Sequence, residues 1–126
     1  MQLPADYKYS NEHTWLKLNS DNSASVGITE FAQSELGEIV YADLPSIGTQ
    51  IKQGEVFGSV EALKTTSDLF APVSGKVIAI NKDAATNPGL LNSDPFDAGW
   101  LIKIELENLS EANNLLDANA YKALVQ

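Results

Sequence analysis

The feature that most restricts the fold is a series of short segments in which apolar and polar residues alternate. In the first, Leu16 and Leu18 fall on one side, whereas Trp15 and Lys17 fall on the other. A period of two residues is that of a β-strand with one buried face. Alternating segments follow at 24–28, 55–63, 69–73 and 100–105, and two short apolar runs at 39–42 and 77–80 are also expected to be strands, with glycine and proline between them. Closely spaced strands with marked turns are typical of small barrels and sandwiches, so the expected fold is mainly β.

Two segments depart from this period. Thr29 precedes 30–36 and Gly37 follows it, which predicts a short helix near residues 29–36 with a cap at each end. Near the C-terminus, Ser110 precedes apolar residues that fall four apart. This spacing predicts an amphipathic helix near residues 110–124.

Residues 81–95 are rich in Asn, Asp, Pro and Ala, and they favour a loop with one helical turn. No linker or low-complexity segment divides the 126 residues. The expectation is therefore one domain over residues 1–126.

Composition excludes several kinds of chemistry. The net charge is −9, and all eight basic residues are lysine, which disfavours nucleic acid as a partner. No apolar run approaches the ~20 residues of a membrane span. The chain contains no cysteine and a single histidine, His13, so it offers no thiol nucleophile and no His or Cys cluster for a metal.

The first six residues lack the charge and apolar pattern of a signal or transit peptide, and we expect a bacterial cytoplasmic protein.

A lysine at a turn between two alternating segments is the most informative local pattern. Lys64 lies 16 residues after Gly48 and 11 before Gly75, and each glycine closes a turn that contains proline. Glu61 and Asp68 flank it. A turn lysine is most often simply solvated, so position alone does not assign a role to it.

The segment resembles the attachment hairpin of biotinyl and lipoyl carrier domains. Biotinyl carriers typically have Met on both sides of the modified lysine, whereas Leu63 and Thr65 stand here. Lipoyl domains of the 2-oxo acid dehydrogenases typically have Asp before the lysine, and that residue is also absent.

Over nearly its whole length the chain resembles the H proteins of the glycine cleavage system. The resemblance is carried, in order, by Tyr9-Ser10-Asn11-Glu12-His13-Thr14-Trp15, Val26-Gly27-Ile28-Thr29, Leu36-Gly37-Glu38-Ile39-Val40, Leu44-Pro45, Val60-Glu61-Ala62-Leu63-Lys64, Ala71-Pro72-Val73-Ser74-Gly75, Pro88-Gly89-Leu90-Leu91-Asn92-Ser93-Asp94-Pro95 and Gly99-Trp100-Leu101. Each block is weak alone, but their order in a chain of this length is specific.

The resemblance implies a fold and a function. The fold would be a barrel-sandwich hybrid like that of lipoyl and biotinyl domains. Lys64 would carry lipoate through an amide bond, and the chain would be a carrier without catalytic residues or a metal. It would shuttle the aminomethyl group of glycine from glycine decarboxylase to an aminomethyltransferase, and dihydrolipoyl dehydrogenase would reoxidise the arm. A lipoate ligase or octanoyltransferase would modify Lys64, with Glu61 as a recognition residue; Gly48, Gly75 and Asp68 would shape the hairpin and its turns.

One departure from the family concerns the cleft that protects the loaded arm. The family usually reads His-Glu-Trp, with that glutamate near the bound amine, whereas this chain reads His13-Thr14-Trp15. If these residues form a strand, Glu12 lies on the same side as Thr14. We therefore expect Glu12, His13 and Thr14 at the cleft, with Glu12 partly replacing the missing carboxylate.

Two alternative functions stay open at this point. The chain could be a lipoyl or octanoyl donor, or a regulatory paralogue, that serves other lipoyl enzymes, because Thr14 departs from the family. It could also be an unmodified interaction domain of the same fold.

Overall fold

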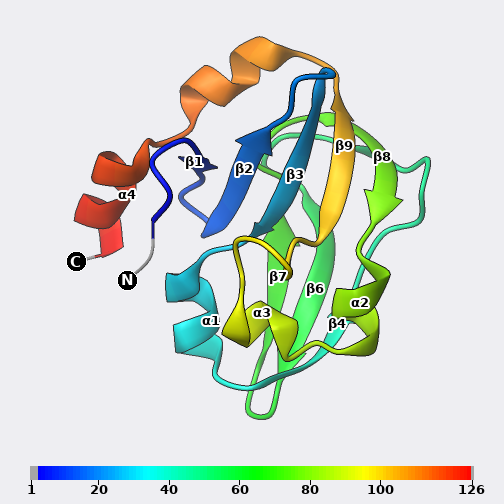
Figure 1. Cartoon of the computed structure of the whole chain (residues 1–126), viewed down its shortest axis with the longest axis vertical. Coiled ribbons are helices and arrows are strands. Elements are labelled where there is room, and N and C mark those ends of the chain that lie inside the picture. The colour runs from blue at the N-terminus through cyan, green and yellow to red at the C-terminus, as the bar shows by residue number, and fades with distance from the viewer. Residues whose placement is uncertain (1–2, 126) are drawn as a thin grey trace.

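The computed structural model describes residues 3–125, and residues 1, 2 and 126 of the expected domain lie outside the described part. The described residues form nine strands and five helices (Figure 1). The strands are β1 Lys8–Tyr9, β2 Thr14–Leu18, β3 Ser23–Ile28, β4 Ile39–Asp43, β5 Gln50–Ile51, β6 Val56–Ala62, β7 Thr66–Phe70, β8 Gly75–Ile80 and β9 Ile102–Leu106. The helices are α1 Glu30–Leu36, α2 Lys82–Thr86, α3 Leu90–Ser93, the 3₁₀ helix η1 Leu109–Asn114 and α4 Ala118–Val125.

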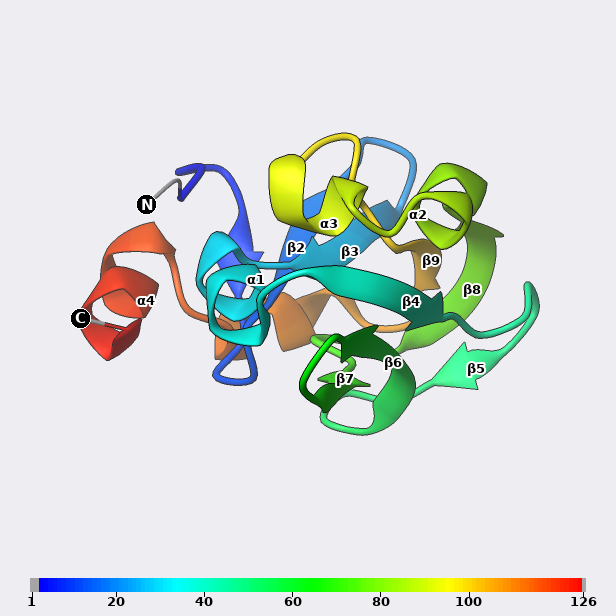
Figure 2. The ribbon, with the colours of Figure 1, turned by 90° about the horizontal axis from the view of Figure 1, so that it is seen from below.

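The strands form two antiparallel sheets, which confirms the expected barrel-sandwich fold. The larger sheet has the order β1-β2-β3-β9-β8-β5, and the smaller has the order β4-β6-β7. The long β6–β7 hairpin projects beyond the rest of the chain at the bottom of Figure 1, and Figure 2 views the molecule from that end. The fold therefore presents one turn at its extremity.

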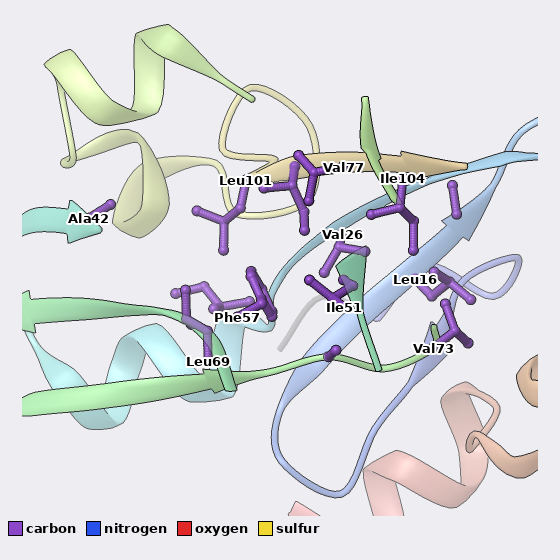
Figure 3. Close-up of a cluster of buried hydrophobic side chains, with 14 of the residues drawn as sticks. Leu16, Val26, Ala42, Ile51, Phe57, Leu69, Val73, Val77, Leu101 and Ile104 are labelled. Atoms are coloured by element: carbon purple, nitrogen blue, oxygen red, sulfur yellow. The ribbon is translucent and has the colours of Figure 1, made fainter. Parts of the chain in front are cut away.

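The core lies between the sheets. Figure 3 shows Val26, Val77 and Ile104 of the larger sheet in one buried cluster with Phe57 and Leu69 of the β6–β7 hairpin. All five side chains are buried. This contact fixes the base of the hairpin to the rest of the molecule through apolar burial.

The predicted helix after Thr29 is confirmed as α1. The Thr29 side chain accepts a hydrogen bond from the Ala32 amide, which satisfies a free N–H of the first turn. Gly37 ends the helix with φ of 79°, a conformation that favours glycine. Both ends of α1 are thus set by local sequence.

The predicted C-terminal helix is confirmed over α4 but not over its expected first half. Residues 109–114 form a 3₁₀ helix, and Leu116 is extended and exchanges two backbone hydrogen bonds with Tyr9, at 2.8 and 2.7 Å. Asn108, rather than Ser110, caps η1, and Asp117 accepts a bond from the Ala120 amide at the start of α4. The bridge to Tyr9 interrupts the helix because it uses groups that a continuous helix would pair internally.

Two other expectations need correction. The segment 81–95 contains two short helices, α2 and α3, where a loop with one turn was expected; Asn81 caps α2 through its side chain. The two-residue strands β1 and β5 carry no alternating pattern of their own and were not predicted.

Candidate functional site

The β6–β7 hairpin carries Lys64 at its exposed tip. Glu61 pairs with Thr66, and the Ala62 amide donates to the Thr65 carbonyl at 2.8 Å. Leu63 and Lys64 therefore form the tip itself, and Leu63 is 70% exposed. Lys64 is exposed at the tip of this hairpin, where the sequence placed it, so a modifying enzyme can reach it.

Neighbouring backbone holds this tip in place. The Leu63 amide donates to the Glu38 carbonyl at 3.2 Å, just before β4. Val60 is fully buried on β6, three residues before Leu63, and Leu69 on β7 is 3% exposed, so buried side chains anchor both strands of the hairpin. A tip with these restraints presents its lysine from a defined direction.

The remaining predicted hairpin residues fall on the strands and turns around it. Glu61 is exposed on β6, where buried Val60 and Ala62 flank it. Asp68 is exposed in the middle of β7 opposite Ser59, so it is a strand residue and not part of the turn. The hairpin turn is shorter than the sequence suggested.

Glycine is favoured at positions 48 and 75 for two different structural reasons. The turn at Gly48 runs from Ser46 to Thr49, one residue later than the sequence suggested, and Gly48 adopts φ of 97° at its third position. Gly75 begins β8 rather than closing a turn. A Cβ at Gly75 would lie 2.5 Å from the Glu105 carbonyl oxygen, so the close approach of two strands excludes a side chain there.

A groove of about 340 Å³ lies beside the returning strand of the hairpin. Its lining residues come from the β1–β2 turn, from α1 and from β7: Glu12, His13, Phe31, Ala32, Glu35, Leu36 and Ser67. Ser67 lies three residues after Lys64, which in a strand corresponds to about 10 Å. The groove combines an apolar wall with two carboxylates, so it suits a chain that is apolar along its length and cationic at its end.

His13 forms one wall of this groove and is held from several sides. Its ring centroid lies 4.9 Å from that of Phe31, and its Nδ1 lies 2.7 Å from the Tyr121 hydroxyl. Burial lowers the pKa of the imidazole below its usual value, although the charges of Glu12 and Glu35 act in the opposite direction. His13 also has φ of 68°, a strained conformation that the hydrogen bonds of this turn maintain.

Thr14, which was expected at the cleft, does not line this groove. Thr14 is 1% exposed, and its hydroxyl donates to the Phe70 carbonyl at 3.2 Å while pairing with the Ser10 hydroxyl at 2.7 Å. The inference that Glu12 and Thr14 share a strand face is wrong, because β2 begins at Thr14 and the left-handed His13 separates the two. Thr14 instead ties the β1–β2 turn to β7.

Sequence reasoning missed Tyr121 and five of the lining residues, namely Phe31, Ala32, Glu35, Leu36 and Ser67. Phe31 and Glu35 are four apart on α1, and helical spacing could have placed them on one face. No sequence pattern could indicate which surface that face meets. Tyr121 lies 108 residues after His13, and its hydroxyl reaches the back of the groove only through the packing of α4.

Comparisons with known proteins agree with one another. The family described as "Glycine cleavage H-protein" matches residues 7–126. The chain is 49% identical to the glycine cleavage system H protein of Symbiobacterium thermophilum over 124 residues, which cover 98% of this chain and 96% of that protein. It is 50% identical to that of Bacteroides fragilis over 125 residues, covering 99% and 98%.

A solved structure extends the comparison to three dimensions. The crystal structure of a glycine cleavage system H protein from Mycobacterium marinum matches with a TM-score of 0.89 at 36% identity, covering 96% of this chain and 97% of that one. Sequence and structure thus agree over almost the whole length. The chain belongs to the glycine cleavage H-protein family.

Proposed function

We propose that this chain is the lipoyl carrier of a glycine cleavage system, with the lipoyl group in amide linkage to the Nζ of Lys64. The observation that carries the proposal is the exposed lysine at the tip of a paired hairpin in a chain of this family. Tethering a reactive group at such a tip gives it a high effective concentration inside each docked enzyme. The protein itself needs no catalytic residue for this task.

The surroundings of Lys64 fit a lipoyl group. When attached, it supplies a disulfide that is reduced as a one-carbon amine is accepted, chemistry that a chain without cysteine cannot supply itself. Phe31, Ala32 and Leu36 provide an apolar wall for an aliphatic arm, and the groove opens three residues from the attachment point. We propose that the groove encloses the loaded arm and keeps water from its end.

The proposed partners are the enzymes that must reach the same arm. They are glycine decarboxylase, the aminomethyltransferase, dihydrolipoyl dehydrogenase and a lipoate ligase or octanoyltransferase. A net charge of −9 favours docking faces rich in basic residues. Reconstitution with the first two enzymes tests this role: glycine-dependent one-carbon transfer supports it, whereas transfer of the acyl group to other lipoyl proteins without glycine turnover would favour a lipoyl donor.

We also propose that residues 1–126 act as one carrier domain in the bacterial cytoplasm. The two sheets share one buried apolar cluster, which supports a single unit. The relatives named above are bacterial, which supports the location. Within residues 3–125, no helix has both the length and the apolar character that crossing a membrane requires.

Glu61→Ala is expected to slow lipoylation of Lys64 about tenfold, because a modifying enzyme that reads the hairpin loses one charge-assisted contact. Glu61 is exposed on a strand whose neighbours are buried, so the fold should be retained. Intact-mass measurement during modification by a lipoate ligase gives the rate. Glu55→Ala is the matched control, since Glu55 is exposed at the other end of the hairpin. Equal rates for wild type and Glu61→Ala would refute the assignment.

Glu12→Gln is expected to speed the release of formaldehyde and ammonia from the loaded carrier between about twofold and fivefold. A partly exposed carboxylate stabilises a nearby ammonium by a fraction of a kcal/mol to about 1 kcal/mol. Glu12 and Glu35 both line the groove, so the double change to Gln should have the larger effect. Glu105→Gln, on exposed β9 surface, is the control. Release at the wild-type rate from the double variant would exclude the two carboxylates as amine partners.

A further inference from the structure

A single hydroxyl at the back of the groove connects two of its walls. The Tyr121 hydroxyl lies 2.7 Å from Nδ1 of His13 and 2.7 Å from Oγ1 of Thr29. Thr29 is the N-cap of α1, which carries the apolar wall. Both the β1–β2 turn and α1 are therefore joined to one side chain of the C-terminal helix α4.

Only one direction of donation along Thr29, Tyr121 and His13 gives both hydroxyl protons an acceptor. Thr29 Oγ1 accepts from the Ala32 amide, so its own proton is free to be donated to the Tyr121 oxygen. Tyr121 then donates to Nδ1 of His13, and the imidazole proton lies on Nε2. In the reverse arrangement, the Thr29 proton would have no acceptor among residues 3–125, and Thr29 is fully buried. Burial also lowers the pKa of His13, which favours the neutral, accepting imidazole.

The Tyr121 ring is held independently of its hydroxyl. It is fully buried and stacks on Tyr9 with centroids 5.0 Å apart and an interplanar angle of 19°. Tyr9 in turn is paired with Leu116 just before α4. Replacing Tyr121 by Phe should therefore remove the hydroxyl and leave the packing of α4 unchanged.

We propose that Tyr121 is a positioning residue that fixes the separation of the His13 and α1 walls and thereby limits escape of the loaded arm. This inference rests on the proposed function of the groove. It acts through His13 and Thr29, since the Tyr121 side chain is fully buried and does not line the groove. The C-terminal helix, remote from Lys64 in sequence, thus contributes to protection of the group that Lys64 carries.

Tyr121→Phe tests the proposal in the full-length lipoylated chain after loading by glycine decarboxylase. The release of formaldehyde and ammonia is expected to accelerate about fivefold, the factor that corresponds to one ordinary hydrogen bond. Tyr7→Phe is the matched control, because it removes another buried tyrosine hydroxyl, which donates to the Phe96 carbonyl at 3.0 Å. The control should release at the wild-type rate. Equal release rates for wild type and Tyr121→Phe would overturn the inference.

A second measurement tests the hydrogen bond between Tyr121 and His13 in protein that carries no lipoyl arm. The chain has one histidine, so the ¹⁵N spectrum of its imidazole reports on His13 alone. In wild type and Tyr7→Phe, Nδ1 should be an unprotonated, hydrogen-bonded nitrogen, and in Tyr121→Phe its resonance should shift. Identical spectra of the unmodified proteins would overturn the inference whatever the arm does. Failure of Lys64 to accept a lipoyl group would instead refute the proposed function and leave the spectral test decisive for Tyr121.

Discussion

Lys64→Arg is expected to abolish glycine-dependent carrier activity completely while leaving the fold intact. Arginine keeps the positive charge at the exposed tip, but its guanidinium is too weak a nucleophile to form the amide that attaches a lipoyl group. The tip makes no contribution to the core, so thermal stability should stay within error of wild type. Reconstituted glycine decarboxylation with the partner enzymes measures the loss.

Lys76→Arg is the control for this substitution, because Lys76 is exposed on β8, away from the hairpin. It should retain full activity. Measurable turnover with Lys64→Arg would mean that another group carries the one-carbon unit, and the assignment of Lys64 would then be wrong.

Gly75→Ala is expected to destabilise the protein by about 2–3 kcal/mol, which corresponds to a fall in melting temperature of about 10 °C. The added methyl group would lie 2.5 Å from the Glu105 carbonyl oxygen, and that oxygen belongs to strand backbone that cannot move alone. Gly75 pairs with both Ile51 and Leu106, so relief of the clash must disturb two strand contacts. Thermal unfolding followed by circular dichroism measures the change.

Gly89→Ala supplies a matched comparison. Gly89 has φ of −59°, and the nearest atom to an added Cβ is Asn87 Oδ1 at 3.4 Å. Its melting temperature should change by no more than a few degrees. If Gly75→Ala and Gly89→Ala have the same melting temperature, the close approach of strands is not the reason for glycine at position 75.

Local sequence was sufficient where a structure depends on neighbours in the chain. Thr29 and Gly37 define α1 through contacts within a few residues, and the strands around Lys64 pair across a turn of two residues. The alternating apolar residues of β3 and β9 also face the core as their period requires. In β2 the prediction holds only for Leu16, because Leu18 is 41% exposed and Trp15, expected on the outer face, is buried in a second apolar cluster. These elements could be predicted because their geometry depends mainly on residues that are near one another in the sequence.

Several features that sequence could not predict involve distant partners. The bridge between Tyr9 and Leu116 interrupts the expected C-terminal helix, and no sequence pattern indicates that these two residues pair. Thr14 is buried by its bond to the Phe70 carbonyl, 56 residues away. Similarly, the groove exists only because α1, the β1–β2 turn and β7 pack together, so its apolar wall and Glu35 become recognisable only in three dimensions.

Thr14, which stands where the family usually has glutamate, is buried and does not line the groove. It does not leave an empty place in the groove for a missing carboxylate, since Thr14 is enclosed by Ser10 and Phe70. The groove keeps two carboxylates of its own, Glu12 and Glu35. The proposed protection of the arm therefore rests on these lining residues, and Thr14 contributes only by holding the β1–β2 turn against β7.

Mass mapping of the protein purified from its native cells tests the carrier assignment most directly. Proteolysis should yield a peptide containing Lys64 whose mass is increased by one lipoyl group, with every other lysine unmodified. Fragmentation should place the added mass on Lys64 and on no neighbouring residue. An unmodified Lys64 in protein from glycine-grown cells, or a lipoyl group on another lysine, would contradict the account.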